Sequence, residues 1–62
     1  MLNNDKYKMN DVYYSINEVS KILKVAYLTV YRWVRVGKLN ALRAGKQYRI
    51  SKTDLDGFLK NK

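Results

Sequence analysis

Arginine side chains along residues 26–37 are spaced so that they share one side of a helix. At 100° per residue, one face is polar and consists of Leu28, Tyr31, Arg32 and Arg35. The opposite face is apolar and consists of Ala26, Val30, Trp33, Val34 and Gly37. A helix held by its apolar face can present guanidinium groups to the base edges and phosphates of a DNA major groove. An ordinary amphipathic helix with a solvated charged face is the alternative that these residues alone leave open.

The charge of the chain indicates the same chemistry. Thirteen Lys and Arg residues against five Asp and Glu residues give a net charge of +8. Residues 1–12 contain two lysines and two aspartates, so the whole net charge lies in residues 13–62. A strongly cationic domain favours a polyanionic partner, most often nucleic acid. A membrane is not the expected partner, because surface binding calls for a long basic amphipathic helix.

The residue types that the chain lacks limit its chemistry further. It contains neither Cys nor His, so a zinc site is not expected, and the absence of Cys fits a reducing compartment. No nucleophile–base pair and no phosphate-binding glycine loop occur, and we therefore expect no enzymatic activity, no cofactor and no metal. Residues 1–10 lack the apolar stretch of a secretory signal. We expect a cytoplasmic, nucleoid-associated protein.

Two short helices joined by a tight turn are expected to carry the cationic face. Residues 15–18 match the S-x-x-E capping box, and an apolar stripe of Ile16, Val19, Ile22 and Leu23 follows. Residues 24–26 separate this helix from the second, which Gly37 should end in a left-handed conformation. Such a pair is a helix-turn-helix whose second helix contacts the ligand. An αα-hairpin without a DNA-binding role has the same outline.

A β-hairpin and a closing helix complete the predicted domain. Residues 40–43 and 47–50 alternate in polarity around a predicted three-residue loop at 44–46. In this register the inner face of the hairpin carries Leu42, Tyr48 and Ile50. The outer face carries Arg43, Gln47 and Arg49. Ser51 should then cap a last helix. The predicted fold class is mainly α with a small β-hairpin, a winged helix-turn-helix.

The polar residues 1–12 are predicted to form a flexible N-terminal arm, and residues 13–62 the folded domain. A short strand is expected at residues 12–14, where Val and Tyr are β-prone. The predicted core contains Val19, Ile22, Leu23, Val30, Trp33, Val34, Leu39, Ile50, Leu55, Phe58 and Leu59.

Five segments carry a resemblance to a known family: residues 14–19, 29–34, 37–39, 45–50 and the apolar positions of 54–59. In order and spacing they resemble excisionase-type helix-turn-helix domains, which are relatives of the MerR winged-helix domain. The resemblance implies that the second helix enters the major groove and that the hairpin lies over an adjacent minor groove. The residues it assigns to the DNA contact are Tyr27, Leu28, Thr29, Tyr31, Arg32, Arg35, Arg43, Lys46, Gln47 and Arg49. The chain departs from the family pattern at Ala26, where a capping residue is usual.

The expected function is sequence-specific binding of double-stranded DNA. Arg32 is the candidate for a base contact, whereas Arg35, Arg43, Lys46 and Arg49 are candidates for phosphates. Tyr31 has two interpretations, a phosphate contact through its hydroxyl or packing on the hairpin. The resemblance implies an excisionase of a phage or mobile element, acting with an integrase or other recombinase and with further copies of itself. A small transcriptional regulator is the alternative, and an RNA-binding or structural module is the competing class.

Overall fold

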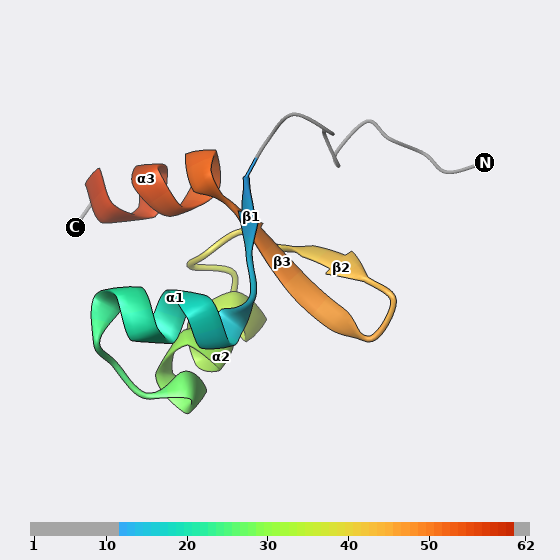
Figure 1. Cartoon of the computed structure of the whole chain (residues 1–62), viewed down its shortest axis with the longest axis horizontal. Helices are drawn as coiled ribbons and strands as arrows, with labels where there is room; N and C mark the ends of the chain where they lie inside the picture. Colours follow the sequence, from blue (N-terminus) through green and yellow to red (C-terminus); the bar gives the residue numbers. More distant parts are fainter. Residues whose placement is uncertain (1–11, 61–62) are drawn as a thin grey trace.

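The computed structural model describes residues 12–60, which fold into three helices and a small antiparallel sheet (Figure 1). The elements in chain order are β1 (Tyr13–Tyr14), α1 (Ile16–Leu23), α2 (Tyr27–Arg35), β2 (Leu42–Ala44), β3 (Gln47–Ser51) and α3 (Lys52–Lys60). This arrangement confirms the predicted fold class, a winged helix-turn-helix in which β2 and β3 form the wing. The predicted arm, apart from Val12, lies outside the described residues. None of the helices within 12–60 is long and apolar enough to cross a membrane.

The predicted capping box starts α1. The Ser15 N–H donates to Glu18 Oε1 at 2.8 Å, and the Glu18 N–H donates to Ser15 Oγ at 3.0 Å. Each residue thereby satisfies a backbone donor that the first turn of a helix leaves open. Helix α2 has no capping box, because its N-cap residue is Ala26 and no side chain caps it.

Helix α2 ends as predicted, at a glycine in the left-handed region. Gly37 has a φ of +85°, which costs a residue without a Cβ little. The Gly37 N–H donates to the Val34 carbonyl and the Lys38 N–H donates to the Trp33 carbonyl. These two bonds are those of a Schellman motif, and they turn the chain toward the wing.

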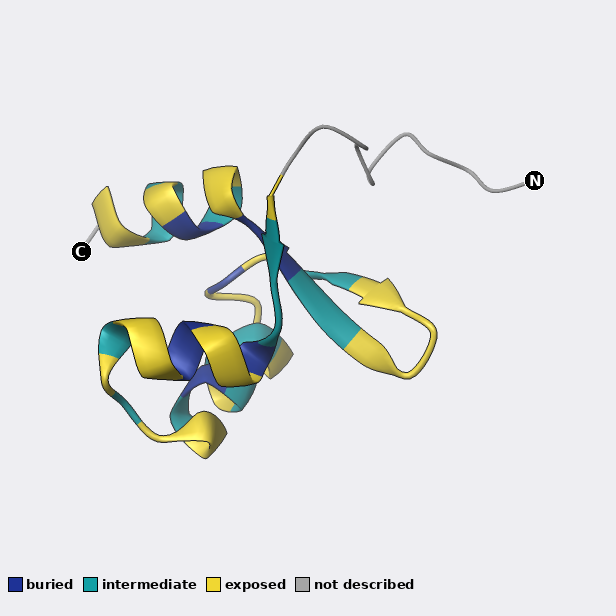
Figure 2. Cartoon of the chain, in the orientation of Figure 1, coloured by how far each residue is buried: buried dark blue, intermediate teal, exposed yellow. Residues whose placement is uncertain are grey.

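The core lies where α1, α2, β3 and α3 meet (Figure 2). Its fully buried apolar residues are Ile16, Val19, Val30, Leu39, Ile50 and Leu55. Four of the predicted core residues pack against this cluster while remaining half-buried: Leu23, Trp33, Val34 and Phe58. The ring centroids of Trp33 and Phe58 are 5.0 Å apart, so this pair joins α2 to α3.

Two residues of the predicted core are exposed, and the prediction was wrong for them. Ile22 is 51% exposed because the buried side of α1 runs through Ser20 instead. The small Ser20 side chain is buried without penalty, since its hydroxyl donates to the Asn17 carbonyl at 2.7 Å. Leu59 is 40% exposed because it lies in the last turn of α3, beyond Leu55 and Phe58, through which the helix packs.

The three-stranded sheet has the order β1-β3-β2, with both pairs antiparallel. Strand β1 pairs Tyr14 with Ile50 and thereby extends the predicted hairpin by one strand. The Lys52 N–H donates to the Val12 carbonyl at 2.8 Å, which continues this pairing to the start of α3. The Asp54 N–H donates to Ser51 Oγ, so Ser51 caps α3 as predicted.

The faces of the wing differ from the prediction. The loop contains two residues, Gly45 and Lys46, so that Ala44 pairs with Gln47 and Arg43 pairs with Tyr48. Gly45 has a φ of +64°, as the first central residue of a type II′ turn requires. A loop shorter by one residue shifts the pairing by one, and a shift of one reverses the faces of one strand relative to the other.

Arg43 therefore shares a face with Tyr48 and Ile50, not with Arg49. Leu42 lies opposite Arg49, so the predicted inner set of Leu42, Tyr48 and Ile50 is also wrong. In the observed register, the Arg43 cation lies on the face of the wing that contains Tyr48 and not on the predicted outer face.

Candidate nucleic-acid interface

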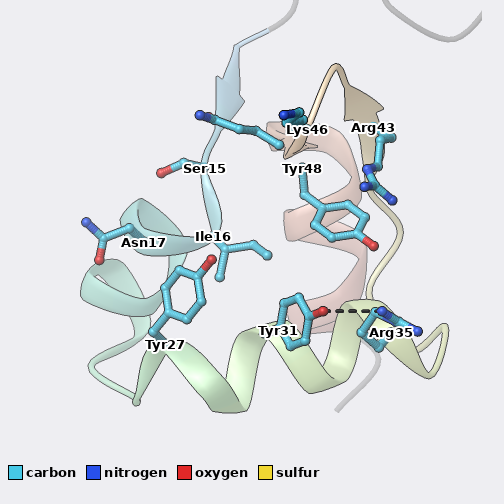
Figure 3. Close-up of a pocket in the computed structure, with 10 residues that line it drawn as sticks. Ser15, Ile16, Asn17, Tyr27, Tyr31, Arg35, Arg43, Lys46 and Tyr48 are labelled. Atoms are coloured by element: carbon cyan, nitrogen blue, oxygen red, sulfur yellow. Dashed lines mark hydrogen bonds between the residues drawn. The ribbon is translucent and has the colours of Figure 1, made fainter.

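A groove runs between α2 and the wing, with the start of α1 at one end (Figure 3). Helix α2 lines it with Tyr27, Tyr31 and Arg35, one residue per turn. The wing lines it with Arg43, Lys46, Gln47 and Tyr48. Residues 15–17 complete the lining. The groove thus collects six of the ten residues that the sequence assigned to the DNA contact, and it takes them from two separate elements.

Tyrosine rings form the floor of the groove. Tyr27 stacks on Tyr31 with a centroid distance of 6.4 Å and an interplanar angle of 13°. Tyr31 meets Tyr48 edge-on at 6.3 Å and 67°. Of the two interpretations of Tyr31, packing on the hairpin is thus present in the structure, and the Tyr31–Tyr48 contact joins α2 to the wing.

Two arginines lie over these rings. The Cζ atom of Arg35 is 5.9 Å from the Tyr31 centroid, and that of Arg43 is 5.3 Å from the Tyr48 centroid. Arg35 Nη1 also donates a hydrogen bond to the Tyr31 hydroxyl at 3.2 Å. This bond is the main cause that raises the pKa of Arg35, and Tyr48 adds a smaller contribution.

The other candidate residues lie outside the groove. Leu28 and Arg32 are exposed on α2, at the positions next to the groove-lining Tyr27 and Tyr31, and Thr29 is half-buried. Arg49 lies on the face of the wing opposite Tyr48, where its Nη1 donates to the Tyr48 carbonyl. Helix α2 therefore has two polar sides, one that faces the wing and one that faces outward.

The contributions of α1 and of Tyr48 to this surface were not predicted from the sequence. Ser15 and Asn17 line the groove, although the capping motif predicts only that a helix starts there and not what it faces. Tyr48 was predicted to lie on the inner face of the hairpin with Leu42 and Ile50, and the predicted three-residue loop gave a register that differs by one from the observed pairing.

The charged side chains that line the groove are all cations, and they come from α2 and the wing. Arg35, Arg43 and Lys46 line it, and no carboxylate does so within residues 12–60. Two of the three acidic residues in this part of the chain have partners outside the wing and α2. Glu18 closes the capping box, and Asp56 pairs with Lys52 at 3.0 Å on α3. A surface with hydroxyl, amide and guanidinium donors and without acidic groups suits an anionic ligand.

A helix-turn-helix whose second helix and wing border a cationic groove defines the class of winged helix-turn-helix DNA-binding proteins. The comparison with known families agrees: residues 13–62 match the helix-turn-helix domain family, and the chain belongs to it. Residues 13–62 are thus a helix-turn-helix domain of the DNA-binding kind.

A relative from Bacillus subtilis (strain 168), whose name is "Uncharacterized protein YvgK", is 44% identical over 48 residues. The match covers 77% of this chain and 16% of the relative, so the chain spans a small part of that protein's length. No solved structure gives a significant match.

Proposed function

We propose that this protein binds double-stranded DNA at specific sequences, with α2 in the major groove and the wing over the flanking minor groove. The observation that supports this most directly is the cationic groove between α2 and the wing, which lies beside an exposed arginine on the outward side of α2. Residues 13–62 act as the binding unit, and the protein has no catalytic role of its own.

Sequence recognition is assigned to the outward side of α2. Arg32 is exposed there, and its guanidinium can donate two hydrogen bonds to the edge of a guanine. Leu28, which is 51% exposed, and Thr29 can contact a thymine methyl group. Tyr27 and Gln47 supply further polar contacts at the border of the groove. Arg32, Leu28 and Thr29 discriminate between bases, because they lie on the side of α2 that would face the base edges once α2 enters the major groove.

Affinity is assigned to the phosphate contacts of Arg35, Arg43, Lys46 and Arg49. Lys46 lies in the exposed turn of the wing, away from the outward side of α2. Contacts to phosphate position a protein on the duplex but carry no sequence information directly.

The biological task that we propose is that of an excisionase of a phage or mobile element. One domain of this size covers a short site, so useful specificity calls for several copies or for a partner already bound to the DNA. An integrase or other recombinase is the proposed partner, with further copies bound side by side. A small transcriptional regulator is the alternative, which needs only a site near a promoter.

The first test selects a preferred site from a pool of random duplexes and then measures Kd on that site and on a scrambled duplex. Arg32→Ala should weaken binding to the selected site by about 1–3 kcal/mol and reduce the preference for it over the scrambled duplex. Lys46→Ala should weaken binding to both duplexes equally and lower the slope of log K against log salt by about one.

Lys60→Ala is the matched control, since it removes one charge from the end of α3, outside the groove lining. With four phosphate contacts, a fourfold rise in salt should weaken wild-type binding by about two orders of magnitude. A pool from which no sequence is enriched would contradict specific recognition. An affinity that does not change with salt would contradict DNA binding through this surface altogether.

A further inference from the structure

We propose that the groove between α2 and the wing holds one phosphodiester strand, and that Tyr31 and Tyr48 are positioning residues that orient Arg35 and Arg43 toward it. This inference rests on the proposed function and specifies how the groove performs it. It assigns to the two tyrosines a role through the arginines instead of a direct contact with DNA.

The composition of the groove indicates the ligand. Phosphodiester oxygens are negatively charged acceptors, and the lining offers guanidinium, ammonium, amide and hydroxyl donors without a carboxylate. The donors come from both borders, with Arg35 on α2 and Arg43 and Lys46 on the wing (Figure 3). A backbone strand in the groove would therefore be contacted from two sides, with the major groove on the side of α2 and the minor groove on the side of the wing.

The tyrosine pair connects the two arginines. Arg35 lies over Tyr31, Tyr31 meets Tyr48, and Arg43 lies over Tyr48, in an unbroken series of contacts from α2 to the wing. An arginine side chain has many rotamers, and much of this conformational entropy is lost when the side chain is fixed on a ligand. Contacts that already restrict the guanidinium in the free protein reduce that loss on binding.

The contacts of Arg35 leave its binding capacity intact. A guanidinium has five N–H donors, and the Tyr31 hydroxyl accepts from one of its nitrogens only. The Arg35 side chain is exposed and lines the groove, so donors that Tyr31 does not use are accessible to a ligand. The Tyr31 hydroxyl thus orients the group without consuming it.

The test is a double-mutant cycle on the full chain, with Kd on a scrambled duplex and its salt slope as readouts. Arg35→Gln should lower the slope by about one. Tyr31→Phe keeps the ring and removes the hydroxyl, and it should weaken binding by about 2–10-fold and also lower the slope. In the Arg35→Gln background, Tyr31→Phe should have no further effect. A purely structural role for Tyr31 would not change the slope.

The Arg43–Tyr48 contact on the wing is tested in the same way. Tyr48→Leu removes the ring under Arg43 and should weaken binding by about 2–5-fold, the value of an exposed cation–π contact. Tyr48→Phe keeps the ring and should restore the affinity. Tyr27→Phe is the matched control, because Tyr27 lines the same groove and stacks on Tyr31, but neither arginine lies over its ring. Any effect of Tyr27→Phe should be the same with and without Arg35.

Melting temperatures of all variants separate loss of binding from loss of folding. The inference is overturned if Tyr31→Phe binds as the wild type does, or if its loss is undiminished in the Arg35→Gln background, since the phenol then contacts DNA itself. A wild-type protein that binds no duplex would refute the proposed function. A wild type that binds with a normal salt slope while the two residues act independently would refute only this inference.

Discussion

Helices α1 and α2 are joined by three residues and have nearly the same length, with eight and nine residues, yet they are held in different ways. Helix α1 begins with a complete capping box and buries Ile16, Val19 and Ser20. Helix α2 has no cap and buries only Val30 fully. The difference indicates that the start of α1 is fixed by its own sequence, whereas α2 depends on contacts with the rest of the domain.

Helix α2 depends on these contacts because it is short and has no side-chain cap. Isolated helices shorter than about 12 residues are marginal in water, so a nine-residue helix without a cap needs tertiary packing. That packing comes from the Trp33–Phe58 pair on one side and the Tyr31–Tyr48 pair on the other. The remaining surface of α2, with Leu28 and Arg32, is free to meet a ligand.

The strongest test of this comparison removes the packing of α2. Trp33→Ala deletes the half-buried indole between α2 and α3 and should lower the free energy of unfolding by about 3 kcal/mol. Leu28→Ala, on the exposed side of the same helix, should change it by less than about 0.5 kcal/mol. Urea denaturation measures both. Equal effects of the two substitutions would mean that α2 does not depend on α3.

A smaller effect is expected from the cap of α1. Ser15→Ala removes the side-chain acceptor for the Glu18 N–H and should cost about 1 kcal/mol. Glu18→Gln is the control, because Gln can also close a capping box and the loss should be a few tenths of a kcal/mol. Thermal unfolding compares the variants. A Ser15→Ala protein as stable as the wild type would show that α1, like α2, is held by packing alone.

The smallest expected effect is a gain in the stability of the domain. Ala26→Ser gives α2 the acceptor that it lacks and should stabilise the domain by about 0.5–1 kcal/mol. Ala26 is exposed and already has the extended backbone of an N-cap residue, so the hydroxyl requires no rearrangement. Ala26→Val, which has no hydroxyl, should give no gain in melting temperature. A loss of stability with Ser would contradict the assignment of Ala26 as the N-cap.

The features that could be predicted from the sequence are those with local causes. The start of α1 follows from Ser15 and Glu18, and the end of α2 follows from Gly37, because each signal acts within one turn of its own helix. The burial of Leu39, two residues after Gly37, was also predicted, since it is the apolar residue at the exit of α2. Together with the alternating pattern that predicts the hairpin at residues 40–50, these signals were sufficient for the fold class.

The features that were not predicted depend on a difference of one residue, in the length of a loop or in the position that is buried, and such a difference changes the geometry substantially. The segment 44–46 is compatible with a loop of two or of three residues, and this choice decides whether Arg43 lies beside Tyr48 or beside Arg49. Ile22 fits the apolar stripe of α1, but the neighbouring elements cover Ser20 instead. The groove itself arises only when α1, α2 and the wing come together, so no local pattern contained it.

The place of β2 at the outside of the sheet has a consequence for the behaviour of the protein at high concentration. An outer strand has backbone N–H and C=O groups that can pair with the same strand of another molecule and seed aggregation. Strand β2 has only three residues, with Arg43 at its centre and Lys46 in the adjoining turn. Two such strands approaching edge to edge would bring like charges together, so the cations of the wing also protect it from self-association.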